Sequence, residues 1–182
     1  MTNMMLLVIG LLLGGLGVAQ AQQEGVMPSW EVIELSEALV ENATSVQTIL
    51  EQVRPKEWLQ DGAPDAYVTQ LEGLRSDLTN LDLSAQALAR KPEKLSLVID
   101  TFLWLDRFES VLSSMNAGVR RYQNASLADL LDAASGENIA AVSKLKEYMR
   151  QLAVERESEM EIAHNEAQRC RSALANQPQA RD

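Results

Sequence analysis

The chain has 182 residues, a formal net charge of −10 and 46% hydrophobic residues. An acidic surface repels phosphate backbones and anionic lipid headgroups, which argues against nucleic-acid binding and electrostatic membrane docking. The single cysteine excludes an intramolecular disulfide, and the three Trp, three Tyr and two Phe leave the core mainly to Leu, Ala and Val. This composition predicts one helical domain that is stabilised by packing alone.

Residues 1–21 have the pattern of a secretory signal peptide. An apolar run over residues 4–18 is followed by Ala19-Gln20-Ala21, a triplet typical of a cleavage site. The run is shorter than the roughly 20 residues that a membrane-spanning helix needs. We therefore expect export to the periplasm or the extracellular space, with cleavage after Ala21. The usual positive residues before the run are missing, so an uncleaved anchor is the alternative.

Two amphipathic helices are predicted after a flexible segment over residues 22–28. The first begins with Ser29 as N-cap and ends before Arg54-Pro55, because proline disfavours helical geometry in the residue before it. The second begins near Pro64-Asp65, and Trp58 in the loop between them is expected to cap the core. Apolar residues alternate at spacings of four and three along both helices, a period that no strand could produce. The two seams are Val32, Ser36, Leu39, Ala43, Val46, Leu50 and Val53, and Tyr67, Leu71, Leu74, Leu78, Leu81, Ala85 and Leu88.

Three further helices are predicted in the second half. Pro92 suits the first turn of a helix that reaches Tyr122. Ser126 and Asp129 match a capping box for a short helix over residues 127–134, which Ser135-Gly136 would end. The last helix runs over residues 138–174, with a charged middle and a far end that protrudes. The domain thus covers residues 29–175, and the tail 176–182 is expected to be disordered.

Short connections make successive helices antiparallel neighbours. The predicted fold class is all-α, an antiparallel up-down four-helix bundle with a short inserted helix and a long C-terminal helix. The alternative is an isolated hairpin of the first two helices beside a longer helical rod.

The only histidine, His164, lies in two patterns that have ligand chemistry. Glu161-Ile-Ala-His164 has the spacing found in di-iron carboxylate bundles, but one histidine cannot complete such a metal set within one chain. An exported bundle with a methionine near its mature N-terminus and a histidine on its last helix is similar to cytochrome b562. This resemblance would make Met27 and His164 the ligands of a non-covalent haem. We favour solvated helix surface for His164 and expect no metal and no cofactor.

Cys170 continues the apolar spacing of Ala163, Ala167 and Leu174. We interpret it as a small packed residue of the last helix. The alternative is an intermolecular disulfide in an oxidising compartment, which would give a homodimer.

No pattern of catalytic residues is present, so an enzyme is not expected. The sequence favours a non-enzymatic protein-interaction or scaffold module of the periplasm, the cell surface or the extracellular space. The long last helix would be its contact surface for a protein partner. The alternative is a carrier that holds a small molecule or haem between helices, with Phe102, Trp104, Leu105 and Phe108 as the pocket wall.

Overall fold

The computed structural model describes residues 26–176, and every regular element in that range is a helix. The elements are α1 (Ser29–Leu50), α2 (Pro55–Trp58), the 3₁₀ helix η1 (Leu59–Asp61), α3 (Ala66–Arg90), α4 (Leu95–Tyr122) and α5 (Ala125–Ala175). The all-α prediction is confirmed for this range. The expected signal peptide and residues 177–182 of the expected tail lie outside it. Between residues 26 and 176, no helix combines the length and apolar character that a membrane crossing needs.

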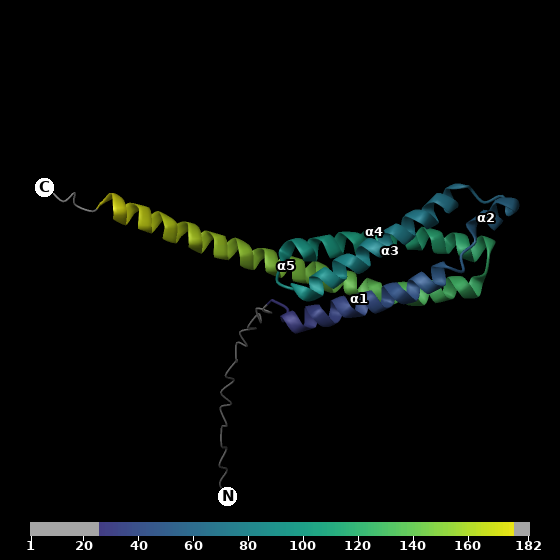
Figure 1. Ribbon diagram of the computed structural model, residues 1–182, viewed down its shortest axis with the longest axis horizontal. Helices are drawn as coiled ribbons and strands as arrows, with labels where there is room; N and C mark the ends of the chain where they lie inside the picture. The colour runs from purple at the N-terminus through teal and green to yellow at the C-terminus, as the bar shows by residue number, and fades with distance from the viewer. Residues whose placement is uncertain (1–25, 177–182) are drawn as a thin grey trace, which may run out of the picture.

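The four long helices pack side by side in the order α1, α3, α4, α5, and α5 also contacts α1 (Figure 1). Contacts at the two ends of α4 show that it runs opposite to α5. Near the end of α4, Asn116 donates to Asp132 of α5, whereas just before its start Pro92 accepts from Tyr148 of α5. We call residues 26–156 the helical body.

The core follows the two predicted seams closely. Every residue of the first seam is buried, and so is every residue of the second except the half-buried Tyr67. Ser36 is the one polar member, and its hydroxyl donates to the Val32 carbonyl one turn earlier at 2.7 Å. A serine that satisfies its hydroxyl within its own helix can be buried at little cost.

Trp58 closes one end of the core, as predicted, and is almost fully buried. Its ring stacks on Tyr122 and meets Tyr67 edge-on, with centroids 6.1 and 5.5 Å away. A Cβ on Gly118 would lie 2.8 Å from Cε1 of Tyr67 and 3.1 Å from Cζ3 of Trp58. Glycine at position 118 therefore lets these rings pack directly against the backbone of α4.

Several predicted helix boundaries are wrong. Pro28, not Ser29, is the N-cap residue of α1, and no side chain caps that helix. Helix α1 ends at Leu50, and part of the expected loop after Pro55 folds into α2 and η1. Pro92 precedes α4 instead of lying in its first turn. Val26 and Met27, assigned to a flexible segment, instead pack against the core.

The predicted short inserted helix does not exist, because α5 runs without a break through Ser135-Gly136. Glycine inside a helix costs only about 1 kcal/mol, which packing of the same stretch against α4 and α1 can outweigh. The predicted capping box is also wrong. Asn124 is the N-cap of α5, and its side-chain oxygen accepts from the backbone N–H groups of Ser126 and Leu127.

Gly118→Ala should destabilise the protein by about 1–3 kcal/mol, because the added methyl overlaps Tyr67 and Trp58. Gly73→Ala is the matched control. It lies in α3 with nothing within 4 Å of an added Cβ, so it should stabilise the protein by about 0.5–1 kcal/mol. Urea unfolding followed by circular dichroism measures both changes. Equal effects of the two substitutions would contradict the close packing at Gly118.

Candidate interaction surface

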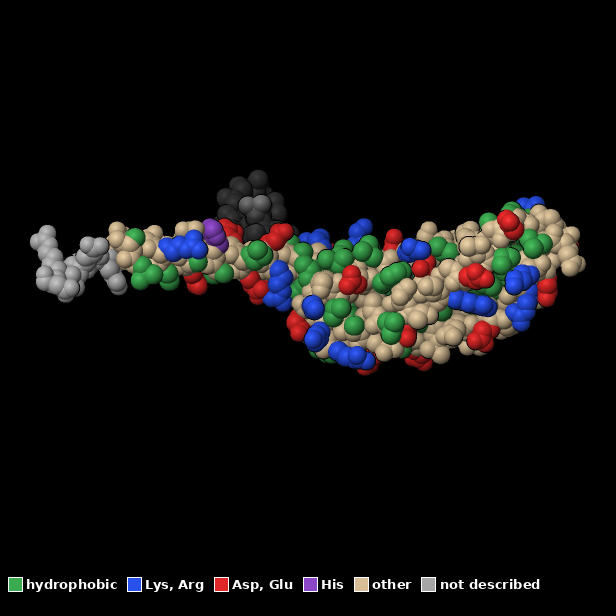
Figure 2. Space-filling model, turned by 45° about the horizontal axis from the view of Figure 1, so that its top comes forward, with side chains coloured by type: hydrophobic (Ala, Val, Ile, Leu, Met, Phe, Trp, Pro, Cys, Tyr) green, Lys and Arg blue, Asp and Glu red, His purple; other side chains and the backbone are tan. Residues whose placement is uncertain are grey.

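Helix α5 extends far beyond the helices that it packs against. It has 51 residues, which corresponds to about 77 Å. Every side chain from Glu157 to Ala175 is exposed, and we call this segment the arm. Figure 2 shows the arm projecting from the body with hydrophobic, acidic and basic side chains at its surface. The arm is the largest part of the described chain that has no neighbouring helix.

Apolar side chains form a stripe along the arm. Met160 and Leu174 are 73% and 67% exposed, and the five stripe residues are Met160, Ala163, Ala167, Cys170 and Leu174. Their spacing alternates three and four. At about 100° per residue they share the helix face of Val142, Leu145, Met149 and Leu152, which pack in or against the core. The face of α5 that packs against the other helices therefore continues along the arm, where it is exposed.

Charges are unevenly distributed between residues 155 and 175 of α5. Residues 155–161 contain four glutamates and one arginine, and Arg156 is paired with Glu159 at 2.5 Å. Residues 162–175 contain one glutamate, the arginines Arg169 and Arg171, and His164. Residues 155–175 of α5 are thus acidic near the body and basic toward the tip of the arm.

The root of the arm is fixed by three hydrogen bonds to segments far away in the sequence. The Tyr148 hydroxyl donates to the Pro92 carbonyl at 2.9 Å. The Met27 backbone N–H donates to the Gln151 side chain at 3.1 Å, and Arg156 donates to the Glu93 carbonyl at 3.4 Å. The start of α1 and the α3–α4 connection therefore lie beside residues 148–156 of α5. The arm begins directly after this part of the helix.

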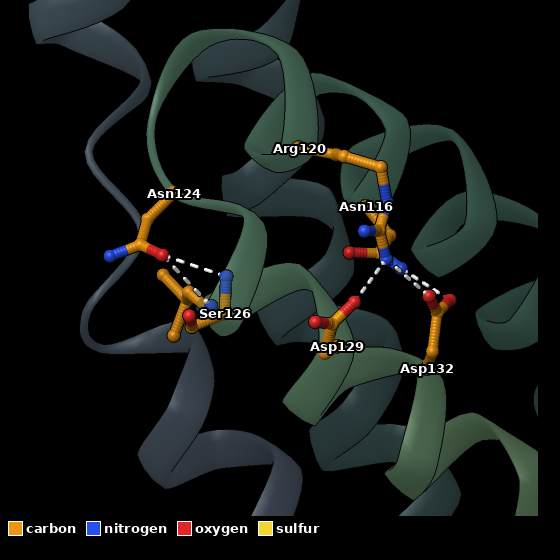
Figure 3. Close-up of polar contacts among 7 residues, drawn as sticks. Asn116, Arg120, Asn124, Ser126, Asp129 and Asp132 are labelled. Atoms are coloured by element: carbon orange, nitrogen blue, oxygen red, sulfur yellow. Dashed lines mark hydrogen bonds and ion pairs between the residues drawn. The ribbon is translucent and has the colours of Figure 1, made fainter.

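Polar contacts join the first turns of α5 to the end of α4 (Figure 3). Arg120 contacts Asp129 at 2.8 Å and Asp132 at 2.6 Å, and Asp132 also accepts from Asn116 at 2.5 Å. These groups bind one another across the helix interface. Their chemistry is that of a structural contact.

Glu109 of α4 is half-buried in the same interface between α4 and α5, further from the end of α4 than Asn116. Its carboxylate accepts from the Ser135 hydroxyl and from the Asn138 amide, the latter at 2.6 Å. Burial raises the pKa of Glu109, and the two hydrogen bonds oppose that rise in part. Sequence reasoning did not find this group, and its only local signal is that polar residues lie close to the apolar seam of α4.

The structure does not bring the predicted haem ligands together. Met27 is half-buried beside Gln151, whereas His164 lies on the arm, exposed, with Gln168 as its contact. Thirteen residues of helix, about 20 Å, separate Gln151 from His164. Glu161 is also exposed on the arm. Between residues 26 and 176, no three His, Cys, Asp or Glu side chains cluster closely enough to hold a metal ion.

The prediction that Cys170 is packed is wrong within a single chain, because Cys170 is exposed. Its neighbours in the stripe are exposed as well. The spacing correctly identified one face of α5, but none of the helices between residues 26 and 176 covers that face at Cys170.

The body carries an open apolar groove beside the root of the arm. It has a volume of about 620 Å³, and its apolar residues are Leu95, Ile99, Met149 and Ala153. The aromatic wall suggested for a carrier lies elsewhere: Leu105 and Phe108 are fully buried, and Phe102 and Trp104 pack against the core. All four residues contribute to the packing of the core.

Comparisons with models of known families, with curated proteins and with solved structures give no match for this chain. We therefore infer its function from its own residues. The arm is the feature that the packing of the body does not explain.

Glu109→Gln should make the protein more stable at pH 7, by less than about 1 kcal/mol because the site is half-exposed. A carboxyl whose pKa is raised by folding loses stability as the pH rises from its ordinary value of 4.5 through the folded value. Glutamine stays neutral and avoids that loss. Urea unfolding of both proteins between about pH 3 and pH 8 measures the difference. A difference that does not change with pH would contradict the raised pKa.

Proposed function

We propose that this chain is an exported four-helix bundle that acts as a non-enzymatic protein-interaction module, with the arm as its contact surface. The main observation that supports this proposal is the exposed apolar stripe on the arm. Export is proposed from the sequence pattern of residues 1–21, and the bundle from the packing order of the four long helices.

A helix with one apolar face buries that face against a partner when a partner is present. The packed part of α5 does so within the chain, and the arm carries the same face into solvent. Contiguous exposed apolar surface on a folded domain often marks a site of protein association. This supports protein contact as the role of the arm.

The body supplies a rigid base for such a contact. Tyr148, Gln151 and Arg156 are each hydrogen-bonded to another segment of the chain at the root of the arm. Because α5 is one continuous helix, the direction of the arm follows from the packing of the body. A preformed surface loses little conformational entropy on binding, which favours recognition.

Removal of residues 157–182 should leave the body folded and abolish binding to protein partners. Every described side chain in the removed segment is exposed, so the thermal midpoint of the body should change by no more than a few degrees. Circular dichroism checks the fold. Pull-down from the envelope and secreted fractions, with the whole and the shortened chain, checks binding. A shortened chain that retains every partner would overturn the assignment of the arm.

A further inference from the structure

We propose that the partner of the arm is a second copy of this chain, and that the two arms pair antiparallel along the stripe. This rests on the proposed role of the arm as a contact surface. Three properties of α5 support it: the spacing of the stripe, the position of the body relative to the stripe, and the charge gradient.

The spacing of the stripe matches a two-stranded coiled coil. Met160, Ala163, Ala167, Cys170 and Leu174 alternate at three and four residues, the pattern that keeps one seam facing a partner helix. Ala163 and Ala167 at the centre are small, so two helices can approach closely there. A second arm presents an identical seam and covers the first along its whole length.

The body excludes a parallel arrangement. The stripe lies on the face of α5 that packs into the body, and Arg156, on this same face, donates to the Glu93 carbonyl. A parallel second α5 on this face would run into the α3–α4 connection that contains Pro92 and Glu93. An antiparallel second α5 points its body away, beyond the tip of the first arm, and only its own tip approaches this connection.

The charges favour the same direction. Parallel pairing in register would place the glutamate-rich segment 155–161 of one copy against the same segment of the other. Antiparallel pairing places that segment against the tip, where Arg171 flanks the stripe, whereas Arg169 lies on the opposite face of the arm. Charges that flank a coiled-coil seam set the orientation of the helices.

One register combines these features. It centres the pair near residue 165, with Met160 opposite Cys170 of the second copy and Ala163 opposite Ala167 of the second copy. Glu157 then lies beside Arg171 of the second copy, and the twofold symmetry creates this ion pair twice. The two Cys170 residues are offset by ten helical positions, about 15 Å, which is too far for a disulfide.

The mass of the purified protein, measured by sedimentation equilibrium over a range of concentrations, tests self-association. The wild type should approach twice the mass of one chain. Ala167→Glu places an unpaired charge in the seam and should weaken association at least about tenfold. Asn165→Glu is the matched control, since it adds the same charge on the opposite face of the arm, and should associate like the wild type. A wild type that remains monomeric, or equal association of the two variants, would overturn the second copy as partner.

Cysteine cross-linking tests the orientation. After oxidation, Met160→Cys should give a dimer band on a non-reducing gel, because residue 160 faces Cys170 of the second copy. The wild type and Ser158→Cys, whose new cysteine lies on the opposite face, should remain single chains. A disulfide dimer of the wild type would show parallel arms and overturn the antiparallel pairing.

The two proposals can fail separately. A monomeric wild type whose shortened form loses another protein partner would refute the second copy and leave the arm as a contact surface. Self-association that persists without residues 157–182 would place the contact on the body and refute both.

Discussion

Helix α5 has 51 residues, whereas α1, α3 and α4 beside it have 22, 25 and 28. This mismatch in length determines which part of α5 is packed and which part is exposed. Three helices of similar length can cover only part of α5, and the covered part completes the core. The remainder carries the same apolar spacing but has no neighbouring helix within the described part of the chain. One face of α5 therefore packs into the core in the body and forms the exposed stripe on the arm.

Polar contacts fix how the helices of the body align. Asp77 of α3 is buried and accepts from Arg107 of α4 at 2.8 Å. Asn42 of α1 donates to the Ala134 carbonyl of α5 at 3.3 Å, and Asn138 of α5 donates to Glu109 of α4. Apolar seams of Leu, Ala and Val tolerate sliding by one turn, but a displaced buried polar group would lose its partner at a cost of about 1–3 kcal/mol. Each such contact thus selects one register of its helix pair.

The sequence was sufficient to predict the two seams, which depend on periodicity, and the packing of Trp58 at one end of the core, although several helix boundaries near prolines were wrong. It was not sufficient at Ser135-Gly136, where the sum of contacts with α4 and α1 overrides a weak local breaker. The Glu109 contacts were missed for the same reason, since a pair of residues 29 positions apart leaves no local pattern. Cys170 shows the converse: periodicity identified its face correctly, but periodicity alone does not say whether a neighbour exists.

The arm is helical although all its side chains are exposed, and its position in the chain explains why. An isolated helix of this length is marginal in water, because nucleation is unfavourable. The arm continues a helix that packing has already nucleated, so each added residue gains a backbone hydrogen bond without a new nucleus. Helix formation alone does not require Met160, Ala163, Ala167, Cys170 and Leu174 to share one face. That shared face adds nothing to the stability of a single chain, and it gains stability only when a second helix covers it. The uncovered stripe is therefore the feature from which we propose an assembly of two chains.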